Sequence, residues 1–249
     1  AFVIFKVVAA FGFQVLRIGK RSTAKRLLLL RVFALGRRSE SIYSALNKTW
    51  RSAGSIQMIA GPDLVTTTVE PHEFLDFIAG RLARRFIDSG QTLDLRISQM
   101  DLAADGDGRF RVAEFFCHDD TWKITLSRLA DESDAVLMDL RSFSQSNAGC
   151  VFEIHELFNL VPIERIVFVI DHSTDQDFLR RTMERAWRQI KDRSPNRRSG
   201  SGRVTLAQLN SKNAFANLLY ALCAAASGLV TRETAQERMV QPEPQEFSW

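Results

Sequence analysis

Residues 134–157 read DAVLMDLRSFSQSNAGCVFEIHEL, and this stretch decides the expected fold. It begins as a strand buried within a sheet, continues as a polar loop, and enters a helix at about Cys150. Open α/β sheets bind their ligands in the loops at the carboxyl ends of parallel strands. The stretch therefore predicts a ligand site in this loop, with Glu153 supplying a carboxylate from one turn into the helix.

Strands and helices alternate along most of the remaining chain. Apolar runs predict further strands at about 26–34, 55–60, 165–170 and 204–209, and a helix is expected from Glu70 to about Asp88. Two hairpin arms are expected on either side of Asp105-Gly-Asp-Gly108, whose glycines suit a tight turn. We therefore predict an α/β domain over residues 27–230 with a five-stranded, mostly parallel, doubly wound sheet. Helices cover both faces, and a hairpin-like segment is inserted at about 91–118.

Charge is nearly balanced over the 249 residues, with 33 basic and 29 acidic side chains and a net charge of +4. A nucleic-acid reader normally shows a stronger and clustered basic excess, so nucleic-acid binding is not expected. The basic residues of the loop 191–203 are interpreted as a solvated surface. The three cysteines are an odd number and widely spaced, which favours a reducing, cytoplasmic setting without a disulfide framework.

The two ends of the chain differ from the expected domain in composition. Residues 1–16 are almost entirely apolar and are followed by a basic run, as at the cytoplasmic end of a membrane helix. Sixteen residues are too few to cross a bilayer, and an amphipathic helix docked on the domain is the alternative. We expect residues 1–26 to form a membrane-proximal segment that holds the protein at the inner face of a membrane. Residues 231–249 are polar and proline-containing, which is typical of a disordered tail.

The helix entry Ser146-Asn-Ala-Gly-Cys150-Val-Phe-Glu153-Ile resembles that of TIR (Toll/interleukin-1 receptor homology) domains, whose flavodoxin-like sheet has Ser-x-x-Cys-x-x-Glu-Leu at this place. This chain has one more residue between Ser146 and Cys150, and Gly149 stands where many members have Trp. The inserted segment 91–118 also departs from the family. Other phrases of the sequence resemble bacterial membrane-anchored proteins that carry such a domain at the C-terminus.

The resemblance implies two alternative functions. Many bacterial TIR domains hydrolyse NAD and release nicotinamide, and their catalytic residue is the helix glutamate after the cysteine, which corresponds to Glu153 here. Other members are non-catalytic modules that self-associate in signalling. Hydrolysis passes through an oxocarbenium-like state that a carboxylate stabilises, and it requires neither a metal nor a cofactor. The alternative interpretation of Glu153 is a helix-start carboxylate that the helix dipole favours.

Further substrate-binding residues are expected around Glu153. Arg141 can bind a phosphate, or pair with Asp139 or Asp171. Phe143 is expected to contact the nicotinamide ring, together with Phe152, and the loop serines to contact ribose or phosphate. Asp63 closes the second-strand loop around the ligand or forms a turn, and Arg31 in the first strand needs an acidic partner such as Asp63 or Glu153. The complete predicted substrate-binding set is Arg31, Asp63, Arg141, Ser142, Phe143, Ser144 and Ser146.

The sequence gives weaker support for a cysteine nucleophile, a metal site or a receiver-like switch. Cys150 at a helix start is a candidate nucleophile with His155 as its base. The sequence offers no third group to complete such a catalytic set, so a buried structural thiol is expected. Cys117-His118 lacks the second ligand pair that a zinc site needs, and no metal is expected. A receiver-like switch that uses Asp63 or Asp139 lacks the acidic pair after the first strand.

Overall fold

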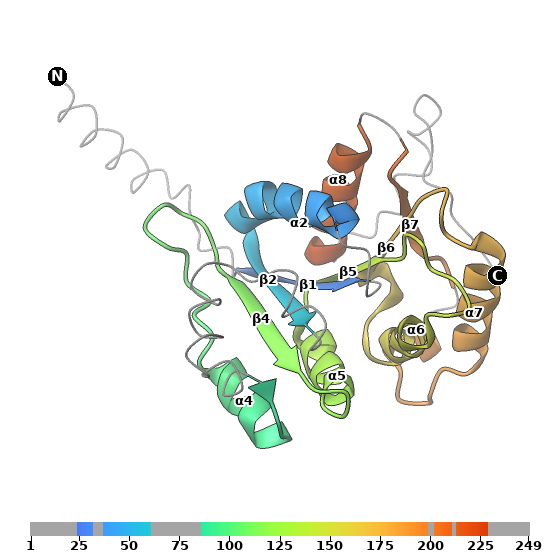
Figure 1. Cartoon of the computed structure of the whole chain (residues 1–249), viewed down its shortest axis with the longest axis horizontal. Helices are drawn as coiled ribbons and strands as arrows, with labels where there is room; N and C mark the ends of the chain where they lie inside the picture. Colours follow the sequence, from blue (N-terminus) through green and yellow to red (C-terminus); the bar gives the residue numbers. More distant parts are fainter. Residues whose placement is uncertain (1–23, 32–36, 61–85, 199–201, 211–212, 229–249) are drawn as a thin grey trace.

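The computed structural model describes residues 24–31, 37–60, 86–198, 202–210 and 213–228, which form an α/β fold with a parallel sheet flanked by helices (Figure 1). Of the membrane-proximal segment predicted at 1–26, only residues 24–26 lie within these ranges. The tail predicted at 231–249 lies outside them. Among the helices of the described ranges, none combines the length and the apolar character that crossing a bilayer requires.

Within these ranges the sheet has seven strands in the order β3-β4-β2-β1-β5-β6-β7, and each neighbouring pair is parallel. The expectation of five strands was therefore wrong, although the parallel α/β class is confirmed. The strands are β1 (Lys25–Arg31), β2 (Gly54–Ala60), β3 (Phe86–Ile87), β4 (Val112–Cys117), β5 (Ala135–Asp139), β6 (Ile166–Ile170) and β7 (Thr205–Gln208).

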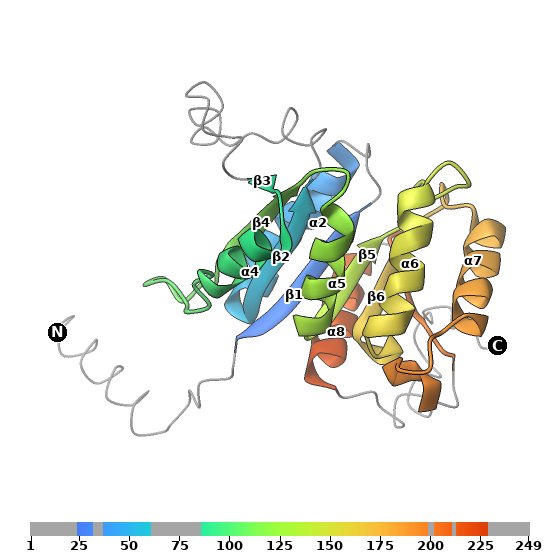
Figure 2. The same ribbon diagram turned by 90° about the horizontal axis from the view of Figure 1, so that it is seen from below.

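Helices cover both faces of the sheet. In Figure 2, α2 and α8 lie on one face, and α4, α5, α6 and α7 lie on the other. The helices are α2 (Arg37–Thr49), α4 (Gly90–Ser98), α5 (Trp122–Glu132), α6 (Ala148–Leu160), α7 (Gln176–Arg188) and α8 (Ala214–Ser227). Three 3-10 turns complete the described elements: η1 (Trp50–Ser52), η3 (Ile163–Arg165) and η4 (Pro195–Arg198).

The central strand β1 explains why the sheet has two cores. Its residues Leu27 and Leu29 pack with α2 and α8, whereas Leu28 and Leu30 pack with the helices of the opposite face. All four are buried, because a strand covered on both faces has no polar side. The continuous apolar run that predicted this strand is thus a direct consequence of its central place.

Gly54 permits the close approach of β1 and β2 where the two strands begin. It pairs with Lys25 in the parallel register. A Cβ atom added at Gly54 would lie 1.8 Å from the carbonyl oxygen of Lys25, which no side chain can satisfy without moving the backbone.

Residues 91–118 do not form the predicted hairpin. The first expected arm, Leu93–Ile97, lies within the helix α4, and the second arm leads into β4, which pairs in parallel with β2 and β3. Ser89 caps the helix by accepting a hydrogen bond at its Oγ from the backbone amide of Thr92 at 3.2 Å. This local cap outweighs the alternating apolar pattern of the segment.

Two other expectations about this region can be compared with the structure. The tight turn at Asp105–Gly108 is confirmed, since the Gly108 amide donates to the Asp105 carbonyl at 2.9 Å and Gly108 has a φ of 80°. Most of the helix predicted from Glu70 to Asp88 lies outside the described residues, but its end was wrong. Phe86–Ile87 form β3, because they complete the sheet beside β4.

Candidate functional site

The candidate site lies where the strand order changes direction. From the central strand β1, the chain builds β2, β4 and β3 on one side and β5, β6 and β7 on the other. Open parallel sheets bind their ligands at such a switch point, beside the carboxyl ends of the strands. Arg31 ends β1 and is the register partner of Asp139, the last residue of β5, so two charged residues stand side by side in the sheet at the switch point.

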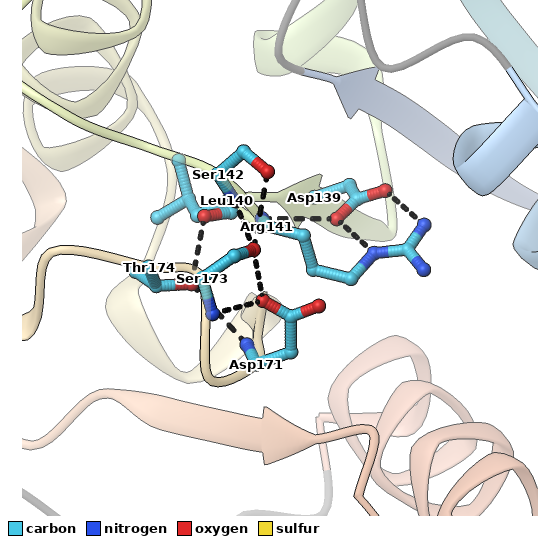
Figure 3. Close-up of polar contacts among 7 residues, drawn as sticks. All are labelled: Asp139, Leu140, Arg141, Ser142, Asp171, Ser173 and Thr174. Atoms are coloured by element: carbon cyan, nitrogen blue, oxygen red, sulfur yellow. Dashed lines mark hydrogen bonds and ion pairs between the residues drawn. The ribbon is translucent and has the colours of Figure 1, made fainter.

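Asp139 and Arg141 form a buried ion pair immediately after β5 (Figure 3). The Arg141 Nε donates to Asp139 Oδ1 at 2.8 Å, and its Nη2 donates to Asp139 Oδ2 at 2.7 Å. Burial lowers the pKa of Arg141, but the hydrogen bond and charge of Asp139, with the charge of Asp171, leave the pKa above its ordinary value. Of the alternatives expected for Arg141, pairing with Asp139 is present, and it engages two of the guanidinium donors.

A second polar chain joins the loop after β5 to the loop after β6 (Figure 3). The backbone amide of Ser142 donates to Ser173 Oγ at 3.0 Å, and the two hydroxyl oxygens lie 3.1 Å apart. Ser173 in turn donates from its hydroxyl and its amide to the carboxylate of Asp171. Thr174 adds a hydrogen bond from its Oγ1 to the carbonyl oxygen of Leu140 at 3.0 Å. The two loops are thus held together as one polar edge.

Ser142 has a left-handed backbone, with a φ of 60°, which no other non-glycine residue adopts within the described ranges. This conformation costs a side chain about 1–2 kcal/mol, so the hydrogen bonds to Ser173 must offset the strain. Strained backbone of this kind is often retained at ligand sites.

Glu153 lies in the second turn of α6 with its side chain turned toward the interior, where it is 3% exposed. Burial raises its pKa to about 8, and the neighbouring Cys150 thiol opposes part of this shift. Among the described residues its Oε2 atom has no hydrogen-bond partner. A buried carboxyl group with an unused oxygen and a perturbed pKa is a candidate for a functional role.

Cys150 is buried in the first turn of α6, three residues before Glu153. Its pKa is raised above the ordinary range by burial first, and then by the nearby carboxylates of Glu153 and Asp139. The thiol therefore stays protonated at neutral pH and is a poor nucleophile. Glu153 and Asp139 therefore both lie close enough to Cys150 to raise its pKa.

The remaining predicted substrate-binding residues occupy different surroundings. Phe143 is fully buried and stacks on Phe178 with ring centroids 5.3 Å apart. Ser144 and Ser146 lie beyond it, with their hydroxyl oxygens 2.9 Å apart, and Ser146 is exposed. Phe152 packs edge-on against Trp122 between α5 and α6. The structure thus brings Arg141 and Ser142 together with the two acidic strand ends, and it places the two phenylalanine rings in packing contacts.

Two further expectations concern Asp63 and metal binding. Asp63, predicted to close the second-strand loop, lies outside the described residues. Within the described ranges, no three His, Cys, Asp or Glu side chains are grouped as metal ligands.

Ser173 and Thr174 were missed by the sequence-based site prediction. They belong to the run Asp171-His-Ser-Thr-Asp175, which follows the buried strand β6 directly. A polar run after a fully apolar strand was the signal that could have identified them, by the same reasoning that identified Arg141 and Ser142.

The comparisons with known proteins provide no relative for this chain. No protein-family model matches it, and no match is found among curated proteins or solved structures. The chemistry of the carboxyl edge is therefore the basis for a functional proposal.

Proposed function

We propose that this chain contains a TIR-like domain that binds NAD at the carboxyl edge of its sheet and hydrolyses the bond between nicotinamide and ribose. The observation that supports this proposal is the carboxyl group of Glu153, which is 3% exposed and retains an oxygen without a hydrogen-bond partner in the described part of the chain. A site that binds a ribose needs such an acceptor, because each ribose hydroxyl is a donor that must be satisfied when it leaves water.

The chemistry requires Glu153 to be ionised when the bond breaks. The bond between C1′ of the ribose and the nicotinamide nitrogen breaks with its electron pair on nitrogen, and positive charge develops on the sugar. A carboxylate beneath the sugar stabilises that charge. Water then adds to C1′ and gives its proton to Glu153, which restores the neutral acid that burial favours. A cationic nicotinamide ring in the site lowers the pKa of Glu153 and so promotes its ionisation.

The neighbouring residues then have positioning roles. The two hydrogen bonds from Arg141 to Asp139 fix the loop after β5 and neutralise a carboxylate that would otherwise oppose the ionisation of Glu153. Ser142 is half-buried beside this pair and offers a hydroxyl group to the ligand. In this proposal the serines recognise ribose or phosphate, and Arg141 acts through Asp139.

The test is nicotinamide release from NAD by the purified protein at high concentration, comparing wild type with Glu153→Gln. The substitution keeps the volume of the side chain and removes the carboxylate, and we expect at least a hundredfold loss, as for other charge-stabilising groups. Glu156→Gln is the matched control on the same helix, since Glu156 lies near the surface and contacts Ser127 and Lys191. Equal activity of wild type and Glu153→Gln, or no release by either at any concentration, would contradict the proposal.

A second candidate function is a non-catalytic module that self-associates. The observation that favours it is the pair Leu95 on α4 and Ile124 on α5, which are 57% and 45% exposed. The two helices are neighbours, because Gly90 at the start of α4 lies against the Ile124 side chain. If this surface joins two copies, Leu95→Glu with Ile124→Glu will reduce the mass measured by light scattering to that of a monomer. An unchanged mass excludes this surface.

A further inference from the structure

The net positive charge of the chain is unevenly distributed. Residues 17–31 carry six basic and no acidic side chains, and a second local excess lies after β6, within the described residues. Residues 176–198 contain eight of the 33 basic residues and three of the 29 acidic residues, which gives this segment a charge of +5. The rest of the chain has 25 basic and 26 acidic residues and is therefore slightly negative. Because the whole chain has a net charge of only +4, its balanced composition conceals a local excess.

The segment forms the outer helix of its layer and the turn that follows it. Figure 2 shows α7 at the end of the layer, with α6 on its inner side, and α6 and α7 are in contact. One face of α7 buries Leu179, Met183 and Ala186 against the core. The basic side chains of α7 and of the residues up to Arg198 all belong to exposed residues.

Three of these arginines form a row along α7. Arg181, Arg185 and Arg188 follow each other at intervals of four and three residues, which places them on one face of the helix. The row extends over about 10 Å at the rise of an α-helix. Together with Glu184 and Gln189 it lines a surface hollow of about 440 Å³. This hollow and the eight exposed basic residues of segment 176–198 are called the α7 basic surface below.

The acidic residues nearby neutralise only part of this charge. Arg188 approaches Glu184 at 3.5 Å, but such exposed pairs contribute little. Arg181 and Arg185 have no acidic partner within 4.0 Å among the described residues. Arg185 also lowers the pKa of His155, after the larger effect of burial, so its field extends to the neighbouring helix. The surface thus presents cations whose charge is available to an anionic partner.

We propose that the α7 basic surface binds the phosphate backbone of a nucleic acid. Seven of its eight cations are arginine, whose planar guanidinium donates two parallel hydrogen bonds to a phosphate. The row of arginines is long enough to contact more than one phosphate. None of the large apolar side chains that are exposed in the described residues lies on this surface, so it lacks the groups that an interfacial helix inserts into lipid.

Binding at this surface is expected to be independent of base sequence. Trp187 is the only aromatic residue of the segment besides Phe178, and its ring packs edge-on against Phe158 at 6.2 Å. Phe178 likewise stacks on Phe143. With both rings engaged inside the fold, no aromatic platform is offered for base stacking, and phosphate contacts dominate.

The test measures fluorescence anisotropy of a labelled duplex DNA and a labelled single-stranded RNA between about 50 and 200 mM salt. The test variant replaces Arg181, Arg185 and Arg188 with Gln. The control replaces three exposed cations elsewhere, Lys48, Arg109 and Lys123, with Gln, so that both variants lose the same net charge. Circular dichroism checks that both are folded.

The wild type is expected to bind with an affinity that falls steeply with salt, because phosphate contacts release counterions. The test variant should bind at least tenfold more weakly, with a salt slope reduced by about 2–3. The control should stay within about twofold of wild type, since its cations are dispersed. Equal losses in the two variants would attribute binding to net charge alone and overturn the assignment.

Two further probes test the class of partner. Vesicles containing an anionic phospholipid test a membrane surface, and poly-glutamate tests an acidic polypeptide. Binding of vesicles without binding of nucleic acid, or displacement of the nucleic acid by poly-glutamate at equal charge concentration, would overturn the proposal. Absence of nucleic-acid binding at low salt would do the same. The result is independent of NAD hydrolysis, which is measured separately.

Discussion

The guanidinium of Arg141 and the carboxylate of Asp139 form a two-point ion pair between residues that are 2 apart in the chain and almost completely buried. Asp139 Oδ1 also accepts the backbone amide of Arg141 at 3.2 Å. The loop therefore folds back on the end of its own strand, and the conformation of Ser142 follows from this closed turn.

Arg141→Leu is expected to lower the free energy of unfolding by about 3–5 kcal/mol, because it leaves the carboxylate of Asp139 buried without its partner. Arg141→Leu combined with Asp139→Leu should recover most of the loss, since no buried charge then remains. Urea unfolding measures both. Arg180→Leu is the control, because it removes an exposed pair with Asp177 and should change stability by less than about 1 kcal/mol. A double variant as unstable as the single one would contradict this explanation.

The burial of Glu153 predicts a stability that decreases with pH. Its pKa is raised from 4.5 to about 8 in the folded chain, so the folded state holds a proton that the unfolded state has lost between these values. The stability is fully present below pH 4.5 and is lost as the pH rises toward 8. Relative to Glu153→Gln, the wild type should lose on the order of 3 kcal/mol between pH 4.5 and 7, measured by urea unfolding. Glu164→Gln, at an exposed position, should show no such trend.

The same ionisation predicts the pH dependence of the proposed reaction. If the carboxylate form of Glu153 supports NAD hydrolysis, kcat/KM will rise with pH and level off above about 8, because this parameter reports the ionisation of the free enzyme. Initial rates of nicotinamide release between pH 6 and 10 measure the profile. Activity that decreases through pH 8 would instead require the protonated acid.

The left-handed backbone of Ser142 predicts an unusual order of substitutions. Ser142→Gly removes the steric cost of the φ of 60° but also removes the hydroxyl contact with Ser173, while the backbone amide still donates to Ser173, so stability should change by less than about 1 kcal/mol. Ser142→Val should lose about 2 kcal/mol or more, because a β-branched side chain tolerates this conformation poorly. Thermal unfolding distinguishes the two. Gln145→Val in the same loop is the control and should be nearly neutral, since Gln145 is exposed.

Two glycines should respond to alanine in opposite directions. Gly54→Ala places a Cβ 1.8 Å from the carbonyl oxygen of Lys25 and should destabilise the pairing of β1 with β2 by more than about 3 kcal/mol. Gly149→Ala lies in the first turn of α6 with no atom within 4 Å of the new Cβ, and should stabilise by about 0.5–1 kcal/mol. Soluble expression and thermal unfolding provide the comparison. Equal behaviour of the two variants would show that the close approach at Gly54 is not limiting.

The sequence predicted the parts of the fold in which one physical signal dominates. The strands β1, β5 and β6 carry apolar residues on both faces, and such runs have few alternatives in an α/β chain. By contrast, β3 has only two residues, and the alternation of Leu93, Leu95 and Ile97 is the pattern of a strand although the segment is a helix. There the cap at Ser89 decides the outcome, and Leu95 is left exposed.

The candidate site was likewise predictable from the sequence only in part. The loop after β5 was identified from its polar residues, and pairing of Arg141 with Asp139 was one of three alternatives that the sequence left open. The environment of Glu153 was not predictable, because its helix position is compatible with a surface cap or with a buried carboxyl. Likewise, Ser173 joins Ser142 only through the neighbourhood of β5 and β6 in the sheet. The basic surface of α7 was divided in the sequence between a helix and a loop, so its combined charge was underestimated.

The central place of β1 has a consequence during synthesis of the protein. The Arg26 amide donates to the Asp134 carboxylate across a separation of 108 residues, at the point where β1 begins to pair with β5. Ribosomes add about 5–20 residues per second, so several seconds pass between the synthesis of β1 and that of its second neighbouring strand, β5. During this interval the nascent chain is a substrate for chaperones. A ribosome stalled before Asp139 would release a product prone to aggregation.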